Sequence, residues 1–330
     1  MPPSRVGYYR EPTVSGDRVV FVCESDLWSV SLSGGLARRL TANYVDARSP
    51  VLSPDGNWLA LVGREEGLSE VYVMPAEGGP VSRLTHQGAY CLVTGWSQDS
   101  KRIRYVSHAE QVPRHGSRPW IVSREGGPAD LVPVGPADRL VEGPDRALLL
   151  GRNIGSPSRW KRYRGGRTGY FWIDREGDGE FVPLPTFGGN LADPMWIGER
   201  IYFLSDHEGH GNLYSMTPRG KKLQRHTQHE SFYARNAKSD GANVVYQSGG
   251  ELWVFEVAAQ RERKLEVEVA SAKPQLRRKF VPAAPYLESG DVHPKSHSIA
   301  LGVRGKPFVL GNWEGEVRQL GVRYGVRYRM

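Results

Sequence analysis

The feature that most constrains the fold of this chain is an aromatic residue that returns at a fixed place in six successive segments. The six positions are Trp28, Tyr72, Trp120, Trp172, Tyr214 and Trp253. They are separated by 44, 48, 52, 42 and 39 residues, and each lies just after the start of the third strand in a pattern of four short strands. A period of about 40–50 residues with four strands is typical of β-propeller blades. Because a single blade cannot bury both of its faces, the sequence predicts that the blades stack in a ring.

The clearest repeat covers residues 49–85. Its four predicted strands are Val51 to Ser53, Trp58 to Val62, Glu70 to Met74 and Val81 to Thr85. Turn-forming residues separate the strands at Pro54-Asp55-Gly56-Asn57 and at Glu77-Gly78-Gly79. Short strands joined by such turns form antiparallel hairpins. The segment therefore predicts one four-stranded antiparallel blade.

The repeats predict an all-β chain with two domains. Residues 1–270 are predicted to form a six-bladed β-propeller, and residues 271–330 a linker and the first blade of a second, incomplete propeller. The linker includes Lys273 to Lys279, and the blade after it would expose Ile299, Leu301 and Val303. The alternative is a seven-bladed ring in which residues 271–330 pack between the first and sixth blades. The residues after Tyr324 resemble the opening strand of a further blade, which favours the front part of a longer protein.

Composition agrees with short strands and turns. The 330 residues include 39 glycines and 23 prolines, which argue against long helices. No apolar run approaches the roughly 18 residues of a membrane span. No apolar segment follows Met1 as in a signal peptide. Cys23 and Cys91 each lie in an apolar strand, which predicts buried thiols and a cytoplasmic location, with no membrane partner.

The net charge of +8 raises the question of an acidic partner. The densest basic patch is Arg159-Trp160-Lys161-Arg162-Tyr163-Arg164 together with Arg167. Basic residues interleaved with aromatic ones can bind nucleic acid. The sequence favours a solvated hairpin with two aromatic anchors, so nucleic acid is not the expected partner. The patch lies in an insertion, Gly151 to Gly169, which is either an elongated surface hairpin or a loop that contacts the carboxylate end of a peptide.

Several motifs resemble those of a known family. Ser53-Pro54-Asp55-Gly56, Arg39-Leu40-Thr41 and Arg83-Leu84-Thr85 are shared with TolB-like and peptidase propellers. More specific are Arg304-Gly305-Lys306-Pro307-Phe308, Glu314-Gly315-Glu316-Val317 and Gly325-Val326-Arg327-Tyr328-Arg329. These last segments look like the opening of the second propeller in the tricorn protease family. The chain resembles the N-terminal region of that family over essentially its whole length.

The resemblance implies a six-bladed propeller followed by a seven-bladed one and then by a serine peptidase core with a PDZ domain. In the family, this core trims oligopeptides inside a hexameric cytoplasmic cage, and the propellers admit or release peptides. The catalytic residues belong to the later core. The resemblance therefore implies that this chain carries no catalytic residue, binds no cofactor and has no peptidase activity by itself.

A direct search for chemistry gives only weak candidates. No G-x-S-x-G motif occurs, and Gly305-Lys306 is followed by proline instead of completing a phosphate-binding loop. Asp174 to Gly179 resembles the first half of a calcium loop, but Pro185 occupies the position of its bidentate Glu. His207 and His210, with His226 and His229, could form a metal site. The sequence favours ordinary polar turns in both places, so no metal ligand is predicted.

The leading hypothesis is the non-catalytic propeller portion of a tricorn-like serine peptidase, which acts as a peptide channel, gate or docking platform. Its expected partners are peptides, the remaining domains of the parent peptidase and further copies in a homo-oligomer. The alternative is a stand-alone TolB-like scaffold that binds another protein at one face. A third, weaker hypothesis is a nucleic-acid-associated propeller, for which strong salt dependence of binding would be the sign.

Overall fold

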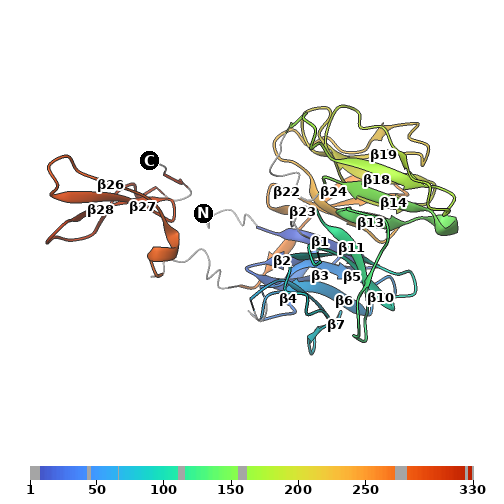
Figure 1. Ribbon diagram of the computed structural model, residues 1–330, viewed down its shortest axis with the longest axis horizontal. Coiled ribbons are helices and arrows are strands. Elements are labelled where there is room, and N and C mark those ends of the chain that lie inside the picture. The colour runs from blue at the N-terminus through green and yellow to red at the C-terminus, as the bar shows by residue number, and fades with distance from the viewer. Residues whose placement is uncertain are drawn as a thin grey trace. The chain divides into compact units, whose positions relative to one another are not determined.

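The fold is built almost entirely of short β-strands. The computed structural model describes residues 8–42, 46–65, 67–110, 116–154, 162–271, 281–323 and 326–328. Its strands form seven sheets, each a meander of four antiparallel strands in chain order, with a fifth strand added to one of them. The chain divides into two compact units, Met1–Ala272 and Lys273–Met330 (Figure 1). The predicted all-β class and four-stranded antiparallel sheets are confirmed.

Six sheets belong to the first unit and one to the second. Sheet 1 contains β1 (Arg10–Ser15), β2 (Arg18–Cys23), β3 (Asp26–Ser31), β4 (Gly35–Arg39) and β25 (Val267–Val269). Sheet 2 contains β5 (Arg48–Leu52), β6 (Trp58–Gly63), β7 (Glu70–Pro75) and β8 (Ser82–Arg83). Sheet 3 contains β9 (Cys91–Trp96), β10 (Arg102–Ser107), β11 (Arg118–Ser123) and β12 (Asp130–Leu131).

The remaining sheets follow the same plan. Sheet 4 contains β13 (Arg139–Glu142), β14 (Leu148–Arg152), β15 (Tyr170–Asp174) and β16 (Val182–Pro183). Sheet 5 contains β17 (Leu191–Ile197), β18 (Arg200–Ser205), β19 (Asn212–Met216) and β20 (Gln224–Arg225). Sheet 6 contains β21 (Arg235–Ser239), β22 (Asn243–Ser248), β23 (Glu251–Glu256) and β24 (Arg261–Leu265). Sheet 7, in the second unit, contains β26 (Leu287–Val292), β27 (Ser298–Val303), β28 (Lys306–Gly311) and β29 (Arg318–Gln319). Short 3₁₀ turns occur at Pro144–Arg146 and Ala284–Tyr286.

The six repeating aromatic residues occupy equivalent positions, as predicted. Each is the third residue of the third strand of its sheet. Each also faces the fourth strand with the same offset, so that Trp28 lies opposite Arg39, Tyr72 opposite Arg83 and Trp253 opposite Lys264. In sheet 7, Phe308 has the same place opposite Gln319. The constant offset shows that the hairpin between the third and fourth strands is one repeated local structure.

The Arg-Leu-Thr segments that close the strands have a physical role in this hairpin. The hydroxyl of Thr41 donates to the buried carboxylate of Asp26 at 2.8 Å and accepts the backbone N–H of Leu27 at 2.9 Å. Arg39 forms an ion pair with the same carboxylate. Sheet 2 repeats the arrangement with Glu70 as the acid. These contacts satisfy a buried charge and fix the end of the fourth strand to the beginning of the third.

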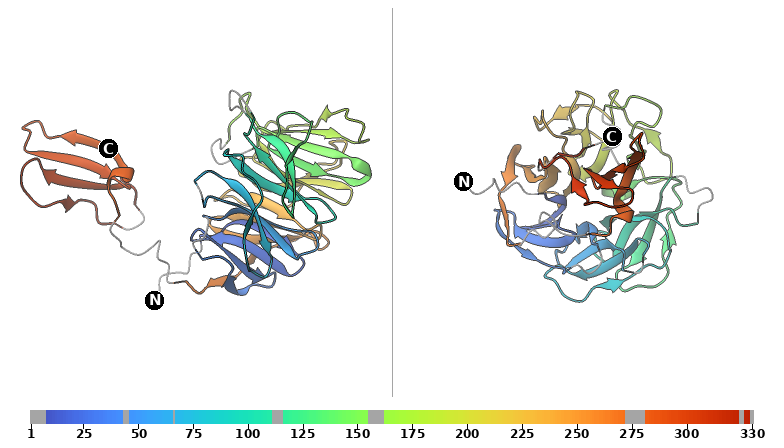
Figure 2. Two further views of the ribbon diagram at one scale, coloured as in Figure 1. Left: turned by 60° about the horizontal axis from the view of Figure 1, so that its bottom comes forward. Right: turned by 90° about the vertical axis from the view of Figure 1, so that its left-hand side faces the viewer.

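The sheets of the first unit pack face to face around a common axis (Figure 2). Their first strands lie innermost and contact one another in a closed cycle, β1–β5–β9–β13–β17–β21–β1. Apolar side chains fill the spaces between neighbouring sheets. Both cysteines are buried thiols rather than a disulfide. Within the described residues, no helix is long and apolar enough to cross a membrane.

Candidate functional site: the central lumen

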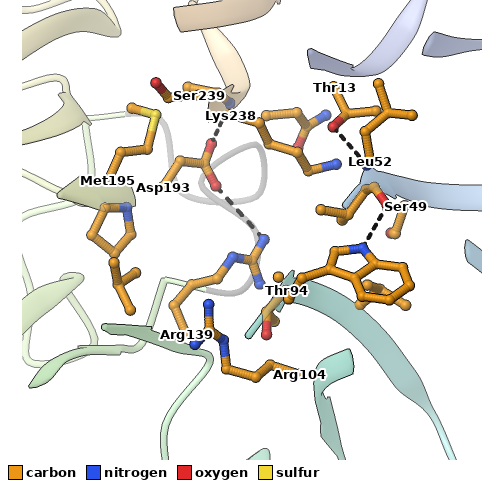
Figure 3. Close-up of a pocket in the computed structure, with 18 of the residues that line it drawn as sticks. Thr13, Ser49, Leu52, Thr94, Arg104, Arg139, Asp193, Met195, Lys238 and Ser239 are labelled. Atoms are coloured by element: carbon orange, nitrogen blue, oxygen red, sulfur yellow. Dashed lines mark hydrogen bonds and ion pairs between the residues drawn. The ribbon is translucent and has the colours of Figure 1, made fainter. Parts of the chain in front are cut away.

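The most distinctive cavity of the first unit lies on its axis and is called the lumen here. It has a volume of about 630 Å³ and is lined by residues of all six inner strands, β1, β5, β9, β13, β17 and β21 (Figure 3). Many lining side chains are polar. They include Glu11, Thr13, Ser49, Thr94, Arg104, Arg139, Asp193, Asn236, Lys238 and Gln247. The lumen is therefore a polar space enclosed by strands that are far apart in the sequence.

Bulges in the inner strands bring these polar groups to the lumen. Register shifts occur in β1, β5, β17 and β21, and each contains a residue other than glycine with positive φ. These residues are Glu11 (52°), Ser49 (48°), Asp193 (46°) and Asn236 (55°). A β-bulge releases backbone groups from the ladder and turns side chains to a new direction. The released groups are then available for bonds between sheets.

The bulges link neighbouring sheets through hydrogen bonds. The backbone N–H of Ser49 in sheet 2 donates to the carboxylate of Glu11 in sheet 1. The N–H of Glu11 in turn donates to the side-chain oxygen of Gln247 in sheet 6 at 2.6 Å. The N–H of Ala237 in sheet 6 donates to the carboxylate of Asp193 in sheet 5 at 3.1 Å. Three of the six junctions between sheets are thus joined at bulges.

The other three junctions are joined by side chains that line the lumen. The indole N–H of Trp96 in sheet 3 donates to the carbonyl of Val51 in sheet 2 at 2.9 Å. Arg104 in sheet 3 forms an ion pair with Glu142 in sheet 4. Arg139 in sheet 4 lies 3.6 Å from Asp193 in sheet 5. A polar contact therefore closes every junction around the lumen, and most lining charges belong to the wall of the ring.

Lys238 is a buried lining cation whose hydrogen bond joins two sheets that are not neighbours. Its amine donates to the carbonyl of Pro50 at 2.7 Å and so reaches from sheet 6 past sheet 1 to sheet 2. Burial lowers the pKa of Lys238 to about 8, although the nearby carboxylates of Glu11 and Asp193 act in the opposite direction. An apolar residue at this place would avoid the cost of burying a charge. A strongly shifted group in a cavity is a candidate functional residue, and Lys238 is such a group in the lumen.

Comparison with known proteins identifies the family of the chain. Residues 6–261 match the family model of the tricorn protease N-terminal β-propeller domain. The chain belongs to the tricorn protease family. The resemblance to the N-terminal region of that family, which the sequence motifs indicate, is confirmed.

Individual members of the tricorn family match the chain over nearly its full length. It is 39% identical over 99% of its length to tricorn protease homolog 1 of Streptomyces coelicolor, and 32% identical over 98% to the tricorn protease homolog of Saccharolobus solfataricus. The crystal structure of the tricorn protease matches 95% of the chain with a TM-score of 0.77 at 24% identity, which shows a shared fold. The chain covers 31% and 30% of the two relatives and 31% of the crystallised chain, so it spans about a third of their length.

The four histidines considered as metal ligands each have different partners in this tricorn-family chain. The imidazoles of His207 and His226 lie 2.9 Å and 2.7 Å from the hydroxyls of Ser205 and Ser215. His229 lies 2.8 Å from the carboxylate of Glu262, and His210 packs against the ring of Tyr233. Burial lowers the pKa of His226 to about 4. Among the residues that the structure describes, no group of three metal-binding side chains is found.

The segment that resembles half a calcium loop is a capped turn. The carboxylate of Asp174 accepts the backbone N–H groups of Gly177 at 2.8 Å and Gly179 at 2.9 Å. Burial favours the protonated form of this carboxyl, but the hydrogen bonds from Gly179 and Gly177 outweigh it and lower its pKa. The oxygens that would bind calcium are thus engaged by the turn itself, as the sequence favours.

The described part of the basic insertion is attached to sheet 5. Arg164 donates to the carboxylate and the carbonyl of Asp206, at 3.2 Å and 2.9 Å. The backbone N–H of Arg162 donates to the same carboxylate, and its guanidinium donates to the carbonyl of Gly209 at 3.0 Å. These two arginines therefore anchor the insertion to its own propeller. Arg159, Trp160 and Lys161 lie outside the described residues.

Proposed function

We propose that this chain is the non-catalytic propeller portion of a tricorn-like serine peptidase and that its lumen admits or releases extended peptides. The observation that supports this most is the lumen itself, which is bounded by inner strands of six sheets. Its volume of about 630 Å³ is in the range that holds a ligand the size of a short peptide segment. Its charged groups mostly join one sheet to the next.

We also propose that sheets 1–6 form a complete six-bladed propeller of residues 1–270, and that sheet 7 is the first blade of a second propeller. The closed cycle of inner strands supports the first statement. The aromatic Phe308 at the repeating position, in a sheet whose strands bury no residue, supports the second. Peptides, the rest of the parent peptidase and further copies of the chain are the proposed partners. The hexameric assembly and the cytoplasmic location that the resemblance implies stay predictions.

Peptide binding to a plugged lumen tests the channel. Thr94 lines the lumen, and its replacement in Thr94→Trp adds a large ring to that space. Ser82→Trp adds the same ring to an exposed residue of the outer strand β8 and is the matched control. Fluorescence anisotropy with an unstructured, labelled oligopeptide should show binding weakened about tenfold or more by Thr94→Trp and unchanged by Ser82→Trp. The bound peptide should also protect the Lys238 amine from acetylation.

The outcomes separate the possible modes of action. Binding that survives Thr94→Trp and is lost in Ser82→Trp would place the peptide on the perimeter, as on a docking platform. The absence of any peptide binding by the unmodified chain would contradict the proposal. Because the family's catalytic residues belong to the core that follows the propellers, we expect the peptide to remain intact, which mass spectrometry checks.

A further inference from the structure

The six junctions of the first unit differ widely in apolar packing. Five of them contain ten or more buried apolar residues each, in the clusters between sheets 1 and 2, 2 and 3, 4 and 5, 5 and 6, and 6 and 1. Between sheets 3 and 4, the cluster formed by the described residues has three fully buried members, Ala137, Leu140 and Leu150, and five partly buried ones, Val132, Val134, Leu148, Trp172 and Phe181. Because cohesion between sheets grows with the apolar area that they bury, this is the weakest junction.

The junction between sheets 6 and 1 is reinforced instead. Between sheets that follow one another in the chain, the outer strand leads into the inner strand of the next sheet, but no such connection joins sheet 6 to sheet 1. Residues 261–271, called the strap here, close this junction from outside. They form β24 at the edge of sheet 6 and then β25, which pairs in parallel with β4 of sheet 1.

The strap is fixed to sheet 1 by several hydrogen bonds. The carbonyl of Glu266 accepts the N–H of Gly35 at 2.9 Å, and the carbonyl of Val267 accepts the hydroxyl of Tyr9 at 3.2 Å. Gly34 allows this close approach, since a Cβ at that residue would lie 2.5 Å from the carbonyl oxygen of Glu266. Below the strap, the apolar cluster between sheets 6 and 1 is one of the larger clusters of the unit. This junction is therefore held both outside and inside.

The weak junction and the strapped junction lie opposite each other in a ring of six sheets. They divide the ring into one half of sheets 1–3 and another of sheets 4–6, which can be followed by their colours in Figure 1. At the weak junction, the side chains of Arg104 and Glu142 form an ion pair and are 12% and 34% exposed. Gly95 leaves room for the side chain of Arg104, because a Cβ at Gly95 would lie 3.3 Å from the guanidinium. A partly exposed ion pair can separate and be rehydrated at much lower cost than an apolar core.

We propose that the two halves open and close about the strapped junction as a hinge, with the Arg104–Glu142 pair as the latch, and so change the width of the lumen. This inference rests on the proposed channel function. The backbone N–H of Ala137, just before sheet 4, donates to the carbonyl of Ser117 beside sheet 3 at 2.8 Å. Its hydrogen exchange therefore reports opening at the latch. The amide of Tyr9, which donates to the carbonyl of Gly250 at 2.8 Å, reports opening at the hinge.

Charge reversal at the latch is the main test. In Glu142→Arg, two guanidinium groups face each other, and hydrogen exchange at Ala137 should become about tenfold faster while exchange at Tyr9 stays unchanged. The double variant Arg104→Glu with Glu142→Arg restores opposite charges and should restore slow exchange. Glu180→Arg makes the same charge change at an exposed turn of sheet 4 and is the control. If Glu142→Arg does not fold, Glu142→Gln is compared with Glu180→Gln by the same two reporters.

A pair of glycine variants tests the hinge from the other side. Gly34 and Gly126 occupy corresponding turns with φ of 93° and 89°, but a Cβ at Gly126 would meet no atom within 4 Å. Both alanine variants bear the same backbone strain, and only Gly34→Ala collides with the strap. Gly34→Ala should therefore accelerate exchange at Tyr9 about tenfold relative to Gly126→Ala and leave Ala137 unchanged.

These measurements distinguish the hinge from the channel. Equal acceleration at Ala137 and Tyr9 in Glu142→Arg, or no recovery in the double variant, would overturn the two-half motion. Since hydrogen exchange needs no ligand, a chain that binds no peptide would contradict the proposed function and leave the test of the motion intact. If both hold, Glu142→Arg should also speed peptide entry into the lumen.

Discussion

Strands β6 and β27 show how a blade depends on its neighbours. Both are second strands of their sheets, and both contain an Ala-Leu pair, Ala60-Leu61 and Ala300-Leu301. Leu61 lies opposite Tyr72 and Leu301 opposite Phe308, the repeating aromatic position in each sheet. Every residue of β6 except Trp58 is buried, whereas no residue of β27 is. Almost the same local structure is thus a core strand in the first unit and a half-exposed strand in the second.

The difference comes from the packing of whole sheets. Sheet 2 has sheet 1 on one face and sheet 3 on the other, and Leu61 belongs to the cluster between sheets 1 and 2. The described residues of the second unit form one four-stranded sheet. A lone blade cannot bury both faces, so its hairpins have little apolar stabilisation of their own. Burial in this fold is therefore a property of the ring and not of the blade.

The largest expected effect is on hydrogen exchange of the two strands. Amides of β27 should exchange at least about a thousandfold faster than those of β6, because β27 has no buried residue whereas β6 lies in a packed core. Mass spectrometry of the intact chain after timed deuteration, with digestion after quenching, measures both segments in one sample. Equal protection of β6 and β27 would show that sheet 7 packs against other sheets, as in the seven-bladed alternative.

A matched pair of leucine truncations should give the next largest effect. Leu61→Ala removes a side chain with no solvent exposure and should lower the free energy of unfolding of the first unit by about 3 kcal/mol. Leu301→Ala removes a half-exposed side chain and should cost the second unit about 1 kcal/mol or less. Hydrogen exchange in each unit, measured as urea unfolds the chain, gives the free energy of unfolding of that unit in both variants. A Leu301→Ala variant as costly as Leu61→Ala would mean that the second unit has a core of its own.

Lys238 in the first unit and Lys306 in the second extend the comparison of the two units to polar groups. The pKa of Lys238, about 8, is below its value in an unfolded chain, so the cost of burying its charge is fully present below pH 8. Between pH 8 and about 10.5 the unfolded chain binds more protons at this group than the folded chain does. The destabilising effect of Lys238 on the folded state therefore becomes smaller as the pH rises. From pH 7 to pH 10, the unmodified chain should therefore gain on the order of 2 kcal/mol relative to Lys238→Met.

The control for this prediction lies in the second unit. Lys306 also donates to backbone carbonyls, those of Arg323 at 2.7 Å and Val326 at 3.1 Å, but at the surface of the molecule. Denaturant unfolding of Lys306→Met at both pH values should show no comparable change. A Lys238→Met variant whose difference from the unmodified chain is independent of pH would mean that the Lys238 amine is well hydrated.

The partners of charged and histidine-rich segments are harder to predict from the sequence than the strands are. The histidines of sheets 5 and 6 lie near one another in the sequence, but each bonds to a different neighbour. Arg162 and Arg164 look available for an external acid, yet Asp206 and Gly209 accept their hydrogen bonds. A charge pattern does not show which partners the fold brings to it, because those partners come from other strands.

The sequence by itself determined the blades. The spacing of the aromatic residues located the third strands, and the Arg-Leu-Thr segments located the ends of the fourth strands, because turn chemistry and alternation act within a single repeat. Only the tertiary structure decided what lines the lumen. Lys238 and Pro50 are 188 residues apart, and bulges without a clear sequence signal turn Glu11 and Asp193 toward neighbouring sheets. Such contacts form only when the ring closes. Closure depends on the packing between all of the sheets, and this packing leaves no local pattern in the chain.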